Sequence, residues 1–552
     1  MVSTQADIGN LFLKTQLAWL AHPRECLEAQ QEFLMSMGAL NFTALAYLAG
    51  GYPHPCVHAV EADNRFSDSE WASNPADHLC LQHYITWARW LERLAYDTPG
   101  LTKKEQRNAA FWVRQWLNAF APSNFFLTNP IARQKAEQTT GASLARGIEN
   151  FYADLSARDL QETPAGAFTV GKDLACTPGA VVFRNELMEV IQYRPLRDAV
   201  HAVPVVIVPS WTYKYYLFDL DEKTSMVRHL LSQGLSVFTI SWKNPDASMA
   251  GASYESYLRD GIATAIDVAR GICRAPQVHA AGYGLGGTAL ATLMAWFNRK
   301  YGGRQVPVAH WTLLAALVDF SQPGEIAAFV NEHSLPAIDA LLERQGYLDK
   351  GQLDWSLRML RPNTLIWHYF VHKYLYGETP SPSNIRYWHA DGMRVPAALH
   401  RFCLHRLYVE NRLAEKDGIA IDGCPIDMSR VHQPLYAVGA AEDHVTPWRS
   451  VFAIAPLVRS PIRFVLAAGG HVLGIIPAPD ASADQYHRVG DAGFAIDGEA
   501  WCAQHARQPG SWWADWTAWL RRRCGPMQAP PPVGAPPYSR LADAPGSYVL
   551  EQ

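Results

Sequence analysis

Hydrophobic residues in the first third of the chain recur with the spacing of helices. The clearest segment begins at Thr102, where the sequence TKKE has the form of a capping box, and continues with apolar residues three and four positions apart. These are Trp112, Val113, Trp116, Leu117 and Phe120. Such a stripe is more often buried against a neighbouring helix than presented to a partner. The pattern predicts a helical N-terminal domain over residues 1–180.

From residue 181 onward, short apolar runs bounded by proline and glycine alternate with helix-length stretches. The runs typical of strands are residues 203–210, 236–242, 278–284, 310–317, 434–440 and 462–470. The stretches at 254–270 and 285–299 are amphipathic and predict helices. Strand and helix in alternation predict a parallel sheet with helices on both faces, within an α/β domain spanning residues 181–552.

Two segments of this second domain depart from the alternation. Residues 320–428 are rich in aromatic side chains, mostly helical in pattern and without a clear strand. An insertion of this kind is where α/β enzymes place lids and substrate pockets, so we interpret it as a cap. Residues 525–552 are proline-rich and predict an extended tail on the surface.

Composition narrows the class of protein. A length of 552 residues leaves room for two to four domains. The 48 basic and 52 acidic residues give a net charge of −4, so the composition lacks the excess of positive charge that is typical of nucleic-acid-binding proteins. Nine cysteines without a C-x-x-C pair argue against a metal site and favour a reducing, cytoplasmic compartment. Neither a secretory signal nor an apolar run of about 18 residues is present, so no membrane span is predicted.

Three separated motifs follow the order of an α/β-hydrolase site. A glycine-rich turn, GYGLGG at 282–287, stands between a predicted strand and a predicted helix, and Asp443 and His471 each follow a later strand. Taken singly, a glycine-rich turn packs or binds phosphate, an aspartate caps a turn and a histidine is structural. Their order and the strand before each favour a catalytic constellation, and the fold class predicted is an α/β-hydrolase fold.

Each residue has an expected task in that constellation. Gly284 stands at the apex, where such enzymes carry the nucleophile, and glycines around it allow the tight turn. The backbone N–H of Leu285 and the loop around Trp211 would stabilise an oxyanion. His471 would accept the proton of a nucleophile, and Asp443 would orient the imidazole. His444, next to Asp443, is an alternative base.

Longer motifs carry a resemblance to a known family. They are VPSWTYKYYLFDL, SWKNPDASMAG, GYGLGGT, LRPNTLIWHYFV, EDHVTPW, GGHVLGII and GSWWADWTAWL, with PSNFFLTNP and FTVGKDLACTPGAVVFRNE upstream and APGSYV downstream. In this order, from about residue 80 to the end, the chain closely resembles the single-subunit polyhydroxyalkanoate synthases, the poly(3-hydroxybutyrate) polymerase family.

The resemblance implies a reaction and a setting. Such enzymes polymerise (R)-3-hydroxyacyl-CoA into polyester and release CoA, with the growing chain held on a cysteine at the apex. Asp443 and His471 correspond to the partners of that cysteine. The family uses no metal or redox cofactor, forms homodimers and sits on cytoplasmic polymer granules, so the implied partners are hydroxyacyl-CoA, the polyester, another synthase subunit and the granule surface.

The chain departs from the family at the apex itself. Gly284 has no thiol or hydroxyl, so the nucleophile position is vacant. Cys273, Cys403 and Cys424 have no positional argument for replacing it, and Tyr283 is expected to point to the opposite side of the sheet. Three interpretations follow: an altered copy of an active synthase, a non-catalytic protein that binds granules or a synthase, or a weak thioester or ester hydrolase in which His471 activates water.

A second departure lies in the loop expected to supply an oxyanion donor. The family typically has Ile-Asn where this chain has Thr212-Tyr213, which adds bulk beside that loop.

Overall fold

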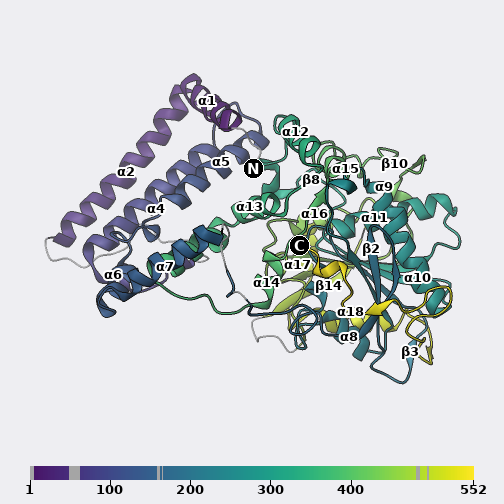
Figure 1. The fold of residues 1–552 in the computed structure, drawn as a ribbon. Helices are drawn as coiled ribbons and strands as arrows, with labels where there is room; N and C mark the ends of the chain where they lie inside the picture. The colour runs from purple at the N-terminus through teal and green to yellow at the C-terminus, as the bar shows by residue number, and fades with distance from the viewer. Residues whose placement is uncertain (1–4, 49–62, 158–161, 165, 480–484, 494–495) are drawn as a thin grey trace. The chain divides into compact units, whose positions relative to one another are not determined.

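The computed structural model describes residues 5–48, 63–157, 162–164, 166–479, 485–493 and 496–552 (Figure 1). Internal contacts divide the chain into two units. Unit 1 comprises residues 1–165 and 355–382, and unit 2 comprises residues 166–354 and 383–552. The segment predicted as a cap is therefore shared, because its middle part groups with the N-terminal helices. No helix among the described residues is long and apolar enough to cross a membrane.

Unit 1 consists of helices. They are α1 (Gln5–Ala21), α2 (Pro23–Leu48), α3 (Glu70–Ser73), α4 (Pro75–Tyr96), α5 (Lys103–Ala119), α6 (Pro130–Gln138) and α7 (Ala142–Ala157), with π-helical turns at Asn363–Trp367 and Phe370–Leu375. The predicted capping box begins α5, where Thr102 and Glu105 bond reciprocally through side chains and backbone. The apolar stripe on α5 is divided: Trp112 is 5% exposed, whereas the stacked Trp116 and Phe120 are 58% and 64% exposed.

A buried ion pair attaches residues 355–382 to α7. Lys373 Nζ lies 2.7 Å from both carboxylate oxygens of Asp154, and the Tyr374 hydroxyl donates to the same carboxylate. Gly147 lies so close to the Tyr374 carbonyl that a Cβ at residue 147 would overlap it. This close approach explains why a segment distant in sequence belongs to unit 1.

Unit 2 is built on an 11-stranded sheet of order β15-β14-β13-β12-β7-β6-β4-β5-β2-β1-β17 (Figure 1). Its strands are β1 (Gly179–Arg184), β2 (Met188–Tyr193), β4 (Val205–Val208), β5 (Val237–Trp242), β6 (Val278–Tyr283), β7 (Val308–Leu314), β12 (Leu435–Ala440), β13 (Ile462–Ala467), β14 (Tyr486–Ala492), β15 (Gln508–Pro509) and β17 (Ala542–Asp543). The six strands predicted from the sequence are β4, β5, β6, β7, β12 and β13, and they pair in parallel. The α/β-hydrolase fold class is confirmed, and the antiparallel strands at both edges are additions that alternation did not reveal.

Helices and short strands complete unit 2. The helices are α8 (Met226–Ser232), α9 (Tyr254–Ser256), α10 (Thr264–Cys273), α11 (Leu285–Lys300), α12 (Leu335–Gln345), α13 (Lys350–Leu360, which continues into unit 1), α14 (Asn384–Ala390), α15 (Ala397–Phe402), α16 (Trp448–Phe452), α17 (Gly498–Gln504) and α18 (Trp513–Arg521), with π-helical turns at Tyr257–Ala263 and Cys403–Val409. Three two-stranded sheets pair β3 (Val200–His201) with β16 (Met527–Gln528), β8 (Tyr347–Leu348) with β9 (Val395–Pro396), and β10 (Ala420–Ile421) with β11 (Cys424–Pro425).

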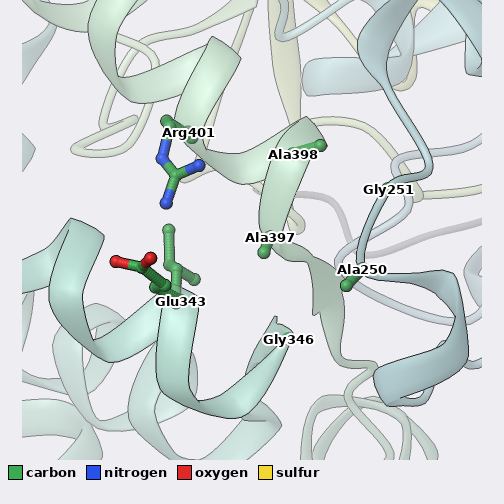
Figure 2. Close-up of a pocket in the computed structure, with 8 residues that line it drawn as sticks. Ala250, Gly251, Glu343, Gly346, Ala397, Ala398 and Arg401 are labelled. Atoms are coloured by element: carbon green, nitrogen blue, oxygen red, sulfur yellow. The ribbon is translucent and has the colours of Figure 1, made fainter.

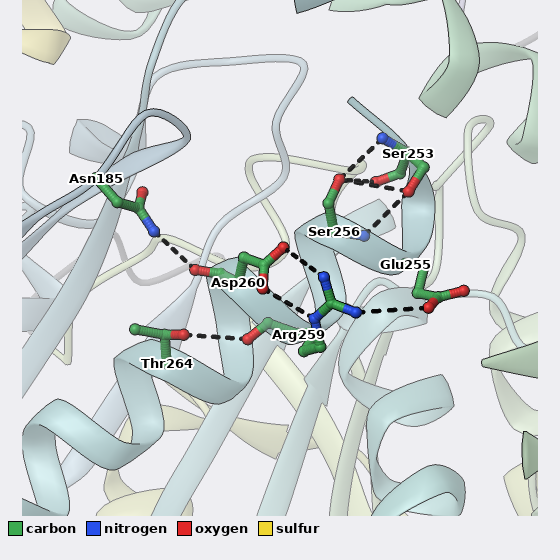
Figure 3. A network of polar contacts seen from close by, with 7 residues as sticks. All are labelled: Asn185, Ser253, Glu255, Ser256, Arg259, Asp260 and Thr264. Carbon is green, nitrogen blue, oxygen red and sulfur yellow. Dashed lines mark hydrogen bonds and ion pairs between the residues drawn. The ribbon is translucent and has the colours of Figure 1, made fainter. Parts of the chain in front are cut away.

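The helix predicted over 254–270 is present but widened in its middle. A capping box between Ser253 and Ser256 begins α9, the π-helical turn follows, and α10 completes the segment. Figure 3 shows the polar contacts of this region, in which Thr264 donates to the Arg259 carbonyl five residues back and Asn185 donates to the Asp260 carbonyl. Two carbonyls inside the wide turn are therefore bonded by side chains from outside it.

The proline-rich tail ends in a segment attached to the sheet. β17 pairs with β1, and the Ser547 N–H and hydroxyl donate to the carboxylate of Glu189, which is 0% exposed. Lys214 Nζ donates to the carbonyls of Val549 and Glu551, at 2.7 and 2.6 Å. Residues 542–551 are thus held by specific contacts.

Candidate active site

The turn between β6 and α11 has a positive φ at its apex. β6 ends at Tyr283, α11 begins at Leu285, and Gly284 between them has φ +53° and ψ −127°. Residues with a Cβ rarely adopt this positive φ, and a sharp strand-to-helix turn of this kind holds the nucleophile in α/β-hydrolases. The predicted elbow is therefore present in the backbone of this chain.

Three other glycines allow the elbow to pack. A Cβ at Gly282 would lie 2.6 Å from the Cα of Gly287, and one at Gly286 would lie 2.5 Å from the Pro209 carbonyl oxygen. A Cβ at Gly287 would lie 2.5 Å from the Cβ of Ala316. Side chains at these positions would force the helix away from the neighbouring strands.

Gly284 differs from these glycines because there is space for a side chain. A Cβ built on it would have two neighbours within 4 Å, the Ser210 Cβ at 3.8 Å and the His471 Nε2 at 3.9 Å. A side chain at residue 284 would therefore project beside a ring nitrogen of His471. No cysteine of the described residues comes within 4 Å of this position.

His471 and Asp443 are joined by a hydrogen bond. His471 follows β13, Asp443 follows β12, and the His471 Nδ1 lies 2.8 Å from the Asp443 Oδ2. Asp443 also accepts from the backbone N–H groups of Val445 and Thr446, both at 2.8 Å, and from the Thr446 hydroxyl at 2.7 Å. The structure thus brings together the acid, the imidazole and the apex that the sequence placed in separate motifs.

The electrostatics favour an ionised Asp443. Burial alone would raise the pKa of this carboxyl, but the charge of His471 and the hydrogen bonds from His471 and Thr446 outweigh it and lower the pKa. A carboxylate beside Nδ1 selects the imidazole tautomer that carries its proton on Nδ1. That tautomer leaves Nε2 as a proton acceptor facing residue 284.

Comparison with known proteins identifies the family. Residues 62–230 match the family model described as Poly-beta-hydroxybutyrate polymerase (PhaC) N-terminus. The chain is 37% identical over 538 residues to the Poly(3-hydroxyalkanoate) polymerase of Methylorubrum extorquens, covering 96% of this chain and 88% of that protein. It belongs to the poly(3-hydroxyalkanoate) polymerase family.

Other relatives carry names from the same family. The identity is 36% to the polymerase subunit PhaC of Cupriavidus necator, covering 88% of this chain and 83% of that protein, and 33% to that of Rhizobium etli, covering 100% and 87%. Among solved structures, an alpha/beta hydrolase fold protein from Chitinophaga pinensis is 13% identical, with a TM-score of 0.30 over 55% of this chain and 93% of that one.

In this member of the polymerase family, Tyr283 contradicts an expectation from the sequence. We expected it to point to the opposite side of the sheet, but its ring lies 5.1 Å from the His471 ring and its hydroxyl 3.4 Å from the His471 carbonyl oxygen. Burial, with a smaller contribution from the charge of Asp443, raises the pKa of Tyr283 well above its usual value. Tyr283 is therefore a neutral phenol that supports the histidine loop.

Tryptophans that the sequence analysis did not assign also hold that loop. The Trp512 indole N–H donates to the Gly474 carbonyl at 3.0 Å, and that of Trp513 donates to the Ile475 carbonyl at 2.8 Å. Both residues lie in the GSWWADWTAWL motif, whose aromatic density was the available signal. Buried indoles satisfy loop carbonyls here, which keeps His471 at the elbow.

The loop expected to supply an oxyanion donor is ordered by its neighbours. Trp211 is 2% exposed and packs edge-on against Tyr257, with ring centroids 5.5 Å apart. The Ser210 and Thr212 hydroxyls are hydrogen-bonded at 2.8 Å, and the Thr212 carbonyl accepts from the Met393 N–H at 3.0 Å. The loop is thus held by specific contacts, and its Ser210 Cβ lies 3.8 Å from the Cβ position of residue 284.

Two of the three cysteines that we considered as substitutes are poor nucleophiles. Cys273 and Cys403 are 8% and 2% exposed. Burial raises the pKa of the Cys273 thiol to about 12 and raises that of Cys403 further. Both remain protonated thiols near neutral pH.

A cavity of about 470 Å³ lies elsewhere in unit 2, and none of its lining residues belongs to the elbow. Figure 2 shows Arg401 of α15 pointing across it towards α12, which carries Glu343. The Arg401 guanidinium is already paired with Asp339, at 3.0 Å. The cavity is otherwise lined mainly by alanine and glycine.

Proposed function

We propose that the site of this chain is built for polyhydroxyalkanoate synthesis, the transfer of (R)-3-hydroxyacyl groups from CoA to a growing polyester with release of CoA. The observation that supports this most directly is the 3.9 Å between the His471 Nε2 and the Cβ position of residue 284. Because Gly284 has no side chain, this chain keeps the scaffold that would bind substrate but cannot form the covalent acyl intermediate.

The residues define how the reaction proceeds once a thiol occupies position 284. His471 Nε2 takes the thiol proton, and the thiolate attacks the thioester carbonyl. The N–H of Leu285, which has no acceptor one turn back in α11, and the Trp211 loop stabilise the oxyanion. The carbonyl then re-forms, the bond to the CoA sulfur breaks and CoA leaves with the proton from His471.

The second half-reaction reuses the same base. The 3-hydroxyl of the next unit gives its proton to His471 and attacks the acyl group held on the thiol. The carbon–sulfur bond breaks, an ester bond forms and the thiol regains a proton. Asp443 keeps the Nδ1 proton of the imidazole in place throughout.

Restoring the nucleophile tests the proposal. We expect Gly284→Cys to release CoA from 3-hydroxybutyryl-CoA and to form polymer, while the chain with Gly284 forms none. Gly284→Ala is the matched control, because it adds the Cβ and its backbone strain without a thiol. A folded Gly284→Cys protein that releases no CoA would contradict the proposal.

A second candidate activity has one observation in its favour. The space at residue 284 is bounded by His471 Nε2, a base that could act on water instead of a thiol. CoA release by the Gly284 chain without polymer, abolished in His471→Gln, would assign slow thioester hydrolysis.

The setting that we propose is the surface of a cytoplasmic polymer granule, with a second synthase subunit as a protein partner. Unit 1 supports it, because its helices expose many large apolar side chains. On α1 and α2 these include Leu13, Leu17, Leu20, Leu27, Leu34, Met35 and Phe42, and on α5 and α7 they include Trp116, Ile148 and Leu155. Exposed apolar surface of this extent marks contact with a partner or an apolar phase.

A further inference from the structure

A small cavity adjoins the elbow. It is lined by Ser210, Tyr213, Leu217, Phe218, Tyr283 and Trp388, among others, and encloses about 10 Å³. A volume of this size is at the lower limit for one water molecule, so it leaves space for no group larger than about a methyl. Lys214 also lines the cavity, but its ammonium group donates to the carbonyls of Val549 and Glu551. Apart from this group and the hydroxyls of one serine and two tyrosines, the lining side chains are hydrocarbon or aromatic ring, which suits a small apolar group.

Two of its walls also border the reaction position. Ser210 Cβ lies 3.8 Å from the Cβ position of residue 284, and Tyr283 is the residue that precedes it. An acyl group held on a side chain at 284 would have its third carbon only three bonds from the attacking atom. The cavity therefore lies within reach of the substituent on that carbon.

Tyr213 forms a wall that is fixed from several sides. Its ring packs on Trp388 and on His389, with centroids 4.7 and 5.4 Å apart. Its hydroxyl lies 3.3 Å from His389 Nε2, and His389 Nδ1 lies 3.3 Å from Asp354 Oδ1. Its backbone forms a β-bridge with Gly392. Rotating the phenol out of the cavity would break its ring contacts with Trp388 and His389 and its hydroxyl contact with His389 together.

The remaining aromatic walls are held as firmly. The Trp388 indole N–H donates to the Lys214 carbonyl at 2.8 Å, and this ring is 2% exposed. Phe218 and Tyr283 pack edge to face, with centroids 5.6 Å apart. A larger ligand group cannot be accommodated by a small side-chain movement, because close-packed walls resist expansion.

We propose that this cavity receives the C3 substituent of the hydroxyacyl group and that Tyr213 is a specificity-determining residue that limits this substituent to a methyl. The proposal rests on the proposed function, since it assigns a part of the same site. It predicts a preference for four-carbon 3-hydroxyacyl groups over six-carbon ones, because two additional methylenes would overlap the Tyr213 ring.

Equilibrium binding to the Gly284 chain tests this without turnover. The probes are two non-hydrolysable thioethers, S-(3-hydroxybutyl)-CoA and S-(3-hydroxyhexyl)-CoA, titrated by calorimetry. We expect the four-carbon probe to bind at least 10-fold more tightly. Tyr213→Ala should reduce this ratio below 3-fold, and Tyr213→Phe, which keeps the ring and loses the hydroxyl, should preserve it.

Each other result overturns the assignment. If the unaltered chain binds both probes with equal affinity, or if the ratio is unchanged in Tyr213→Ala, Tyr213 does not limit the size of the C3 substituent. The proposed function would be unaffected by either result. The same loss in Tyr213→Phe as in Tyr213→Ala would assign the effect to the hydroxyl rather than to size. If Tyr213→Ala does not fold, Tyr213→Leu replaces it as the smaller wall.

If neither probe binds, the inference is also overturned. CoA release by Gly284→Cys then decides separately whether the proposed function stands.

Discussion

Gly284 has the backbone of a nucleophile elbow without the side chain that such a bend presents. Its φ of +53° would be strained for any residue with a Cβ, yet there is space for that Cβ. At Gly282, Gly286 and Gly287 the neighbouring atoms leave no such space. At the scale of one residue, the site therefore lacks a functional group and not the geometry to hold it.

The role of His471 can be tested in a background that carries the thiol. In Gly284→Cys, we expect His471→Gln to lower the rate of CoA release by roughly 100-fold or more, because the thiol loses its general base. The measurement is kcat for 3-hydroxybutyryl-CoA.

His444→Gln in the same background is the control and should change kcat less than threefold. Near-normal activity in His471→Gln, together with loss in His444→Gln, would transfer the role of base to His444.

At the scale of elements, the strands that carry the elbow also bury two histidines. His279 of β6 and His310 of β7 are paired in register, with their Nδ1 atoms 2.6 Å apart. They are 0% and 3% exposed. Burial lowers the pKa of His279 well below its usual value and lowers that of His310 to about 4.

These depressed pKa values predict acid lability of unit 2. Above pH 6.5 the imidazoles are neutral in the folded and unfolded states, so they do not affect stability. As the pH falls from 6.5 towards 4, the unfolded chain binds protons that the folded chain does not, and the free energy of unfolding decreases. From pH 7 to pH 5, His310 alone should account for roughly 2 kcal/mol of this loss.

Urea unfolding at pH 7 and pH 5 measures that loss. We expect it to be smaller in His310→Gln than in the unaltered chain, because one titrating group is gone. His432→Gln removes an exposed histidine and should leave the loss unchanged. An identical loss in all three proteins would show that the pKa of His310 is the same in the folded and unfolded states.

At the scale of the whole molecule, the chain combines a helical unit with exposed apolar side chains and an α/β unit that carries the elbow, Asp443 and His471. Trp116 of α5 and Phe120, which caps the end of this helix, are stacked on each other and more than half exposed. Two large rings in water contribute nothing to the core of unit 1. We infer that they contribute to contact with the polymer surface.

Sedimentation with poly(3-hydroxybutyrate) granules tests this contact. The double variant Trp116→Glu, Phe120→Glu should reduce the bound fraction at least threefold without lowering the melting temperature, because neither ring is buried. Arg107→Glu on the same helix changes the net charge by the same −2 and is the matched control. A bound fraction equal to that of the unaltered chain would place the granule contact elsewhere.

The parts of the fold that could be predicted from the sequence are those that depend on the spacing of nearby residues. The six parallel strands, the α5 capping box and the elbow depend on spacing within about ten residues. The antiparallel strands β1, β2 and β14 were missed because their identity depends on pairing with strands distant in sequence. Tyr283 was oriented wrongly because strand alternation ends where the elbow bends.

By itself the sequence determined the order of elements, the glycines of the elbow and the absence of a nucleophile at residue 284, because each is a property of residue type and spacing. Tertiary structure alone decided that His471 Nε2 and Asp443 meet beside that residue, that Tyr213 closes the adjoining cavity and that residues 355–382 join the N-terminal helices. The physical reason is that these features are distances between groups far apart in the chain, and packing and buried hydrogen bonds set such distances only in the folded molecule.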